Sequence, residues 1–306
     1  MSEKIVLIAD PGIDGAFAVA LALFDPALEV LGLAATPGNV AAEQATANVH
    51  ILIEQLDPPR WPRLGAAPAV AFDMDGRRLH GPNGLGGASF PCSTLHHLQA
   101  SEKVVGEFVK QYPGEVTIVC LGPCTVLARA MDIYPELAGQ VKRLVCLGGT
   151  VREPGNAGPV TEFHFACDPP SARQVIHSGA PLVLVPLDLM RQVLFSPTDL
   201  LGLPADGSRA RAFLRQIVPF GIAATSSLYG IEGFHLKDVL GVVAAARPKL
   251  LETKPAHVDV ETRGELTRGM AVIDQRPWAQ TKSNVDLAVH VDGQGVRDYL
   301  KEVLFS

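Results

Sequence analysis

The chain has 306 residues, 47% of them hydrophobic, which suffices to bury a sizeable core, and one α/β domain over residues 1–306 is preferred to two small domains. The formal net charge is -6 and no basic stripe is visible, so nothing in the sequence indicates a nucleic-acid partner. No apolar run reaches the roughly 18 residues of a membrane helix, and the first residues lack the features of a signal peptide, so we expect no membrane partner and a cytoplasmic location.

The first predicted strand is followed directly by acidic residues. Residues 4–9 have the length and the Val and Ile content of a strand buried on both faces, and the apolar residues from 16 to 24 fit a helix. Asp10 then lies at the carboxyl end of the strand and Asp14 in the first helical turn, at the edge where open parallel sheets bind ligands. A helix cap would explain Asp14 alone, but it does not explain Asp10.

The pattern of strand, loop and helix repeats along the chain. Such alternation implies right-handed crossovers and an open, mainly parallel sheet with helices on both faces. Residues 57–70 form a connection, and residues 72–87 contain too much glycine for a regular element, which is typical of a functional loop. Further strands are predicted at 30–36, 116–122, 143–149 and 182–188, helices at 41–56, 125–137 and 237–246, and alternating segments at 257–261 and 285–291.

Polar side chains follow several of these strands. Asp10, Asn39 and Thr125, with Asp188 as a further candidate, fall at the same edge of the predicted sheet. The five cysteines are an odd number and three lie in or beside apolar runs, so a disulfide framework is not expected. Cys120 and Cys124 lack the second pair that a structural zinc site requires, so buried thiols are favoured there.

Short motifs in a fixed order connect these positions to a known family. They are Asp10-Pro-Gly-Ile-Asp14, Gly38-Asn-Val40, His80-Gly81 with Gly84-Leu-Gly86, Leu121-Gly-Pro-Cys-Thr125, Gly155-Asn156, Glu162-Phe-His-Phe165 with Asp168-Pro169, and Thr267-Arg-Gly269. Over essentially the full length the chain resembles the inosine-uridine-preferring nucleoside hydrolases. The resemblance implies the nucleoside hydrolase fold, with a Rossmann-like core, and a role in purine or pyrimidine salvage.

The resemblance also implies a reaction. A calcium-held water would break the N-glycosidic bond of a ribonucleoside or related N-riboside, giving ribose and free base. Calcium takes six to eight oxygen ligands, and negative charge stabilises the oxocarbenium-like sugar, which explains the need for carboxylates. By resemblance, Asp10 binds the metal and takes the proton from water, while Asp238 and the Thr125 carbonyl are further ligands. The substrate-binding residues it implies are Asp14, Asn39, Asn156, Glu162, Phe163 and His164.

Taken singly, these residues have ordinary structural explanations. Asp14 and Asn39 could be caps, Asn156 could form a turn, and Glu162 could form a salt bridge. The presence of all these residues, in the sequence order of the family motifs, favours a substrate-binding site.

The chain departs from the family pattern where the chemistry is expected. Gly15 replaces an acidic calcium ligand, which predicts a weakly bound ion, and His164 replaces a sugar-binding Asn. Lys237 stands where many members have the His that protonates the leaving base. A lysine suits that role if burial lowers its pKa, and His235 and His80 are the other candidate acids.

These departures keep an alternative function open. The chain could be a catalytically impaired relative that binds a ribose-containing ligand. A dinucleotide-binding oxidoreductase is excluded because no G-x-G-x-x-G follows the first strand. We expect a small-molecule nucleoside or N-riboside as the ligand, and a homodimer or homotetramer as the assembly.

Overall fold

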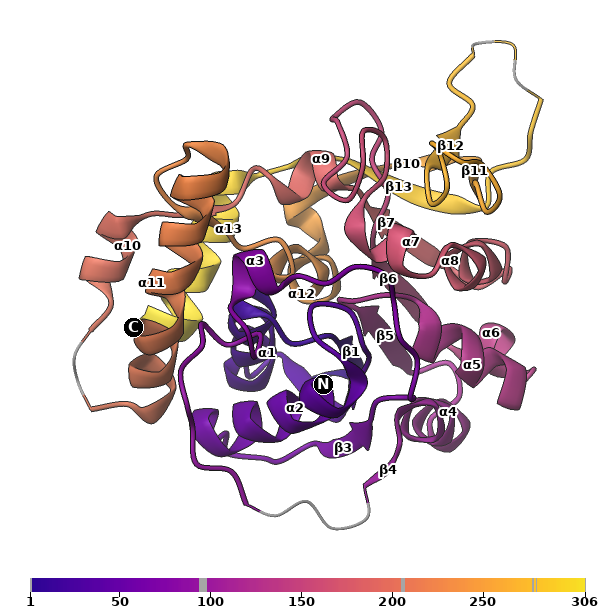
Figure 1. The fold of residues 1–306 in the computed structure, drawn as a ribbon. Helices are drawn as coiled ribbons and strands as arrows, with labels where there is room; N and C mark the ends of the chain where they lie inside the picture. Colours follow the sequence, from indigo (N-terminus) through magenta and orange to yellow (C-terminus); the bar gives the residue numbers. More distant parts are fainter. Residues whose placement is uncertain (1, 94–97, 205–206, 277, 279, 306) are drawn as a thin grey trace.

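The computed structural model describes residues 2–93, 98–204, 207–276, 278 and 280–305 (Figure 1). Across these residues nine strands form one sheet, in the order β10-β13-β7-β6-β5-β1-β2-β3-β4. All neighbouring pairs are parallel except β10 on β13, at one edge, which is antiparallel. The open, mainly parallel sheet predicted from the sequence is therefore confirmed.

The strands are β1 (Glu3–Ala9), β2 (Leu28–Ala35), β3 (Arg63–Ala66), β4 (Gln99–Ala100), β5 (Val116–Cys120), β6 (Arg143–Leu147), β7 (Leu182–Val185), β8 (Leu194–Phe195), β9 (Phe234–His235), β10 (Leu251–Ala256), β11 (Val258–Val260), β12 (Ala271–Ile273) and β13 (Val285–Val291). The α-helices are α1 (Ile13–Phe24), α2 (Ala42–Leu56), α3 (Arg77–His80), α4 (Ser101–Gln111), α5 (Thr125–Ile133), α6 (Leu137–Gln140), α7 (Phe163–Cys167), α8 (Pro169–Ile176), α9 (Leu187–Met190), α10 (Pro197–Gly202), α11 (Arg209–Tyr229), α12 (Val239–Ala246) and α13 (Gly293–Leu300). A 3-10 helix, η1 (Pro248–Leu250), and a π-helix, η2 (Lys301–Phe305), complete the described elements.

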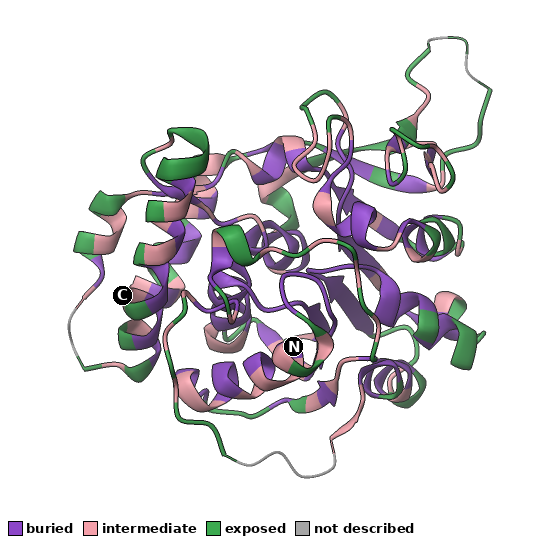
Figure 2. Ribbon diagram, in the orientation of Figure 1, coloured by how far each residue is buried: buried purple, intermediate pink, exposed green. Residues whose placement is uncertain are grey.

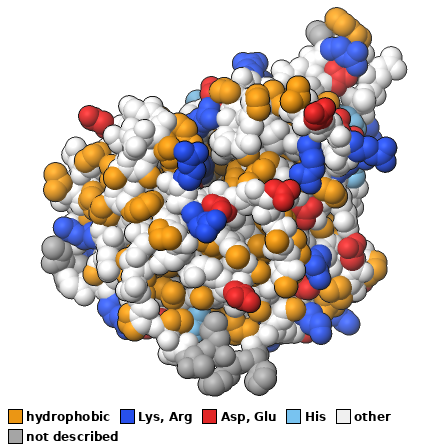
Figure 3. Space-filling view, in the orientation of Figure 1, with side chains coloured by type: hydrophobic (Ala, Val, Ile, Leu, Met, Phe, Trp, Pro, Cys, Tyr) orange, Lys and Arg blue, Asp and Glu red, His pale blue; other side chains and the backbone are white. Residues whose placement is uncertain are grey.

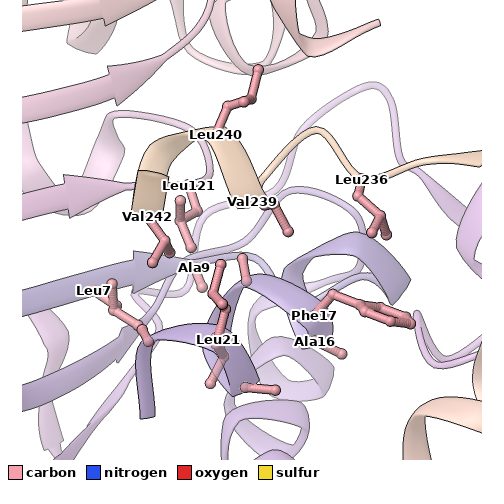
Figure 4. Close-up of a cluster of buried hydrophobic side chains, with 14 of the residues drawn as sticks. Leu7, Ala9, Ala16, Phe17, Leu21, Leu121, Leu236, Val239, Leu240 and Val242 are labelled. Atoms are coloured by element: carbon pink, nitrogen blue, oxygen red, sulfur yellow. The ribbon is translucent and has the colours of Figure 1, made fainter. Parts of the chain in front are cut away.

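The central strand β1 is buried on both faces, as its continuous apolar sequence predicts (Figure 2). Ile5, Leu7 and Ala9 pack with α1, α2, α11 and α12 on one face of the sheet. Val6 and Ile8 pack with α4, α5 and α8 on the other face. Figure 4 shows part of the first layer, in which side chains of β1, α1 and α12 meet.

The register of the central strands aligns their carboxyl ends. Ala9 of β1 pairs with Ala35 of β2, and Ile8 pairs with Cys120 of β5. The loops that begin with Asp10, Thr36 and Leu121 therefore leave the sheet side by side. Polar residues from distant parts of the sequence meet at this edge for that reason.

Several predicted elements need correction. Residues 57–70 contain the short strand β3, which their Pro and Arg content concealed, and residues 72–87 contain the single helical turn α3. The helix predicted over 125–137 ends at Ile133, because the residue before Pro135 disfavours helical geometry, and a second short helix, α6, follows. The strand predicted over 182–188 ends at Val185, since Pro186 is the N-cap of α9.

Other features belong to the surface. On the face drawn in Figure 3, acidic and basic side chains are interspersed among apolar ones. Within the described residues, no helix has both the length and the apolar character required to cross a membrane.

Candidate active site

Asp10 follows β1 and is buried at the centre of the sheet edge. Its Oδ2 accepts a hydrogen bond of 2.9 Å from the backbone N–H of Asn39, and the Asn39 side-chain amide donates to the Asp10 carbonyl oxygen at 2.9 Å. Asp10 Oδ1 has no hydrogen-bond partner among the described atoms. Asn39 therefore fixes the carboxylate and leaves one oxygen available.

Two glycines make room for this carboxylate. A Cβ at Gly38 would lie 2.1 Å from Asp10 Oδ2, and a Cβ at Gly122 would lie 2.8 Å from Oδ1. Either contact is too close for a side chain to be tolerated. The Gly-Asn and Leu-Gly-Pro motifs thus have a physical reason, because the backbone after β2 and β5 closes around Asp10.

Asp14 and His80 meet at the N-terminus of α1. The cap residue Gly12 has no side chain to bind the free N–H groups, and His80 Nδ1 accepts the N–H of Ile13 at 3.1 Å. Nδ1 is therefore unprotonated and the ring proton is on Nε2. Burial lowers the pKa of His80 to about 4, against the opposing effect of Asp14, whose Oδ1 lies 3.6 Å from Nδ1.

Asp238 approaches the same region from the start of α12 and is buried. A Cβ at Gly15 would lie 3.1 Å from Asp238 Oδ2, so position 15 faces this carboxylate. Burial raises the pKa of Asp238, and repulsion from Asp14 and Asp10 raises it further. Burial likewise raises the pKa of Asp10.

These carboxylates fit a cation. Asp10 offers an unpartnered buried oxygen inside a glycine-lined cradle, and a positive ion would offset the repulsion among the buried acids. The set is nevertheless sparse. In the described part of the chain, Asp10, Asp14 and Asp238 do not place three donor atoms within 4.8 Å of one another.

Glu162 and His164 form the opposite side of the site. Glu162 caps α7, because its Oε2 accepts the N–H groups of His164 and Phe165 at 3.0 and 3.2 Å. The His164 ring lies between two carboxylates, with Nδ1 3.6 Å from Glu162 Oε1 and Nε2 4.0 Å from Asp10 Oδ1. Burial lowers the pKa of His164, but Glu162 and then Asp10 outweigh it, and the pKa is raised.

A cavity of about 440 Å³ lies between these two sides, within the size range of small-molecule sites. It adjoins a second cavity of about 240 Å³, and Lys237, Asn156, Leu79 and Tyr229 border both. Asp10 is behind the lining and not part of it. The predicted site residues that line the larger cavity are Asp14, Asn39, His80, Asn156, Glu162, Phe163, His164, Lys237 and Asp238.

Three other predicted residues have different surroundings. His235 lines the smaller cavity only, and its Nδ1 has no partner among the described atoms. The Thr125 hydroxyl donates to Asp168 Oδ2 at 2.6 Å, so its side chain is directed toward α8. Asp188 accepts the N–H groups of residues 151–153 and lines a separate hollow, so it orders a loop.

The sequence did not indicate one wall of the site. Leu228 and Tyr229, at the end of α11, line the larger cavity. Arg78 and Leu79 of α3 also line it, and they lie within the functional loop predicted over residues 72–87. Neither helix was predicted. The apolar and small residues of α11 are interrupted by Pro219, and no motif marked its end.

Comparison of the whole chain with known proteins identifies its family. The model of the inosine-uridine preferring nucleoside hydrolases matches residues 5–298. The chain belongs to this family. It is 35% identical to uridine nucleosidase 1 of Arabidopsis thaliana, over 99% of this chain and 94% of that one. It is 32% identical to the non-specific ribonucleoside hydrolase RihC of Escherichia coli O1:K1 / APEC, over 99% of both chains.

Solved structures of family members share the fold. The plant nucleoside hydrolase PpNRh1 superposes with a TM-score of 0.90 at 29% identity, over the full length of both chains. A purine-preferring ribonucleoside hydrolase from Gardnerella vaginalis superposes with a TM-score of 0.91 at 27% identity, over 99% of this chain and 98% of that one. The homologues of this chain are thus N-glycosidases, as the sequence motifs indicated.

Proposed function

We propose that the chain hydrolyses the N-glycosidic bond of ribonucleosides or closely related N-ribosides and releases ribose and free base. The observation that carries the proposal is the gathering of Asp14, Asn39, Glu162 and Asp238 around one cavity, with the unpartnered carboxylate oxygen of Asp10 behind them. Relatives named as uridine, non-specific and purine-preferring hydrolases support a ribonucleoside substrate and leave the base open.

Calcium, held by Asp10, Asp238 and the Thr125 carbonyl, would supply sites for the attacking water and the ribose hydroxyls. Asp10 takes the proton from water through Oδ1, while the Asn39 N–H holds Oδ2 in place. Asp14 and Glu162 accept hydrogen bonds from the sugar hydroxyls, and the amides of Asn39 and Asn156 donate to them. The same carboxylates stabilise the positive charge that develops on the sugar.

Lys237 is our proposed donor of the proton to the departing base. It borders both cavities, so it can face a base in one and a sugar in the other. His80 is a weaker candidate, because its lowered pKa leaves the ring neutral near pH 7. The pKa of His235 is also lowered, first by burial and then by Lys237.

Product analysis tests the proposed function. Purified protein with calcium should release ribose and free base from uridine or inosine, and Asp10→Asn should slow release by about 1000-fold or more, since it removes the base that activates water. Glu43→Gln is a matched control, because it also removes one carboxylate and lies exposed on α2. No release from any ribonucleoside would reject the proposal.

The alternative of an impaired, ribose-binding relative has a specific observation behind it. Position 15 faces Asp238 but carries no side chain, so the proposed ion has only two anionic ligands, Asp10 and Asp238. Calorimetry with ribose separates the two functions, because an impaired relative would bind ribose while failing to release base from any ribonucleoside.

A further inference from the structure

Three potential metal ligands meet on the outer side of α2, away from both active-site cavities. His50 and Glu54 are four residues apart and therefore lie on the same face of the helix. Cys92 comes from the segment that follows α3. One donor atom from each of the three side chains lies within 4.8 Å of the other two.

The short contacts of His50 with the other two side chains use different ring nitrogens, and the set of one donor atom per residue that could share an ion lies within 4.8 Å. His50 Nδ1 lies 3.0 Å from Cys92 Sγ, and His50 Nε2 lies 3.9 Å from Glu54 Oε1. Ligands around a tetrahedral ion, at bond lengths of about 2.0 to 2.3 Å, are separated by about 3.5 Å. Small side-chain rotations would therefore suffice to place an ion between them.

The segment that carries Cys92 is fastened to α2 on both sides of the cysteine. The N–H of Ser93 donates to both carboxylate oxygens of Glu54 at 3.2 Å, and the side-chain amide of Gln55 donates to the carbonyl of Pro91 at 3.4 Å. The thiol is thus held near the imidazole by contacts that do not use the thiol itself.

We propose that His50, Glu54 and Cys92 bind a zinc-class divalent ion, with water as the remaining ligand. One sulfur, one imidazole nitrogen and one carboxylate oxygen form a donor set that suits zinc, whereas calcium takes oxygen ligands only. This site is therefore chemically distinct from the calcium site proposed above.

A catalytic role for Cys92 is a poorer explanation of the cluster. Neither Cys92 nor His50 lines either active-site cavity, so a nucleophile at this position would have no adjoining pocket for the nucleoside substrate. A bound ion would displace the thiol proton and convert these neighbours into ligands.

The ion would tie the segment after His80 to α2. The same helix already holds that segment through Asn48, whose side-chain amide donates to the carbonyl oxygens of Pro11 and Asn83 at 3.1 and 2.8 Å. A metal at His50 would add a fixed point farther along the segment. The consequence is a structural clamp at the outer edge of the active-site loops.

Cobalt is the spectroscopic probe for this site. Full-length protein, saturated with calcium, should bind one Co²⁺ and develop a thiolate-to-cobalt absorption band. Cys92→Ser should abolish the band, and His50→Gln should weaken cobalt affinity at least tenfold, while Glu43→Gln on the same helix should leave both unchanged. Absence of the band in the unaltered protein, or its persistence in Cys92→Ser, would overturn the proposal.

Thiol labelling tests the same site without relying on a variant that folds. Cys92 is exposed and the other four cysteines are buried, so a thiol reagent should modify one group rapidly in native protein. Zinc should slow this reaction at least tenfold, and a chelator should restore it. An unchanged labelling rate at saturating zinc would overturn the proposal whatever the outcome for nucleoside hydrolysis.

Discussion

At the scale of single residues, Gly15 stands where the resemblance to the family predicts an acidic residue. Its missing side chain would be directed at Asp238, because a Cβ there would lie 3.1 Å from Asp238 Oδ2. That separation is tight but within reach of a small side-chain movement. An acidic residue at this position would therefore add its carboxylate directly beside Asp238.

Gly15→Asp should accordingly bind calcium more tightly than the unaltered protein, by about tenfold, since it supplies a third anionic ligand. Gly15→Ala is the matched control, because it introduces the same Cβ without a charge and should not improve affinity. Calorimetric titration with calcium measures both. Equal affinities for the two variants would mean that position 15 does not contribute to the ion site.

Lys237 allows a second test at this scale. Lys237→Met should slow the hydrolysis of uridine or inosine by about 100-fold, since it removes the proposed proton donor. It should slow an activated N-riboside, whose leaving group needs no proton, by much less. Steady-state kinetics on both substrates measure the difference.

His235→Gln and His80→Gln are the comparison variants. His80→Gln should slow both substrates equally, because this ring accepts the Ile13 N–H and lines the cavity in its neutral form. A selective loss with His235→Gln, together with equal losses for Lys237→Met, would transfer the role of acid from Lys237 to His235.

At the scale of elements, the sequence predicts the central strands of the sheet well and the short elements around them poorly. The strands β1, β5 and β6 consist mainly of apolar residues, because helices cover both of their faces, and that pattern is visible in the sequence. β3 has four residues in a Pro-rich stretch, so its register depends on the neighbouring β2. A pattern of four residues is too short to identify β3 from the sequence.

The same contrast holds for the candidate site. Asp10 and Asn39 follow predicted strands and lie in motifs, so both were identified. Tyr229 lies at the end of α11 and lines the cavity only because α11 packs against α1 and α2. Thr125 was predicted through its motif, but the partner of its hydroxyl, Asp168, is 43 residues away. Long-range packing of this kind cannot be derived from local spacing.

An ion-pair network between elements makes stability depend on pH. Asp259 of β11 accepts hydrogen bonds from the Arg173 guanidinium of α8 at 2.7 and 3.0 Å and pairs with His177 at 2.9 Å. The bond to Arg173 is the largest cause that holds the pKa of Asp259 far below its usual range. The carboxylate therefore stabilises the fold above the unfolded-state pKa of about 3.9, and this stabilisation is lost as the pH falls through the lower folded-state pKa.

Asp259→Asn should lower the free energy of unfolding at pH 7 by about 1 kcal/mol or less, because solvent screens this half-exposed pair. The difference from the unaltered protein should shrink below about pH 4. Urea denaturation at several pH values measures it. Asp274→Asn is the matched control, because Asp274 pairs with Arg276 two residues away and links no elements, and a difference that grew toward acid pH would contradict the assignment.

At the scale of the whole molecule, the aligned strand ends concentrate buried negative charge at one point. Asp10, Asp14 and Asp238 are each at most 3% exposed, and they lie directly after β1, in α1 and at the start of α12. Burial of like charges opposes folding unless a cation compensates them. The stability of the entire fold should therefore depend on the ion that we propose for the active site.

Calcium should raise the melting temperature of the unaltered protein, since an ion that binds only the folded state stabilises it by about 2.7 kcal/mol at a concentration 100-fold above its Kd. The effect of Asp238→Asn on the melting temperature should depend on whether calcium is present. Without calcium, it removes a repelling charge and should melt at the same temperature as the unaltered protein or higher. With calcium, the variant lacks a ligand and should melt at a lower temperature than the unaltered protein.

This crossing of the two melting curves separates a metal ligand from a residue that merely supports the fold, because a structural defect would lower the melting temperature under both conditions. Cys92→Ser serves as the control, since the substitution removes a sulfur ligand of a separate proposed site and should leave the calcium response intact. If calcium left the melting temperature of the unaltered protein unchanged at millimolar concentration, Asp10 and Asp238 would be buried acids without an ion. The loss of the carboxylate at position 15 would then have removed the calcium site from this chain.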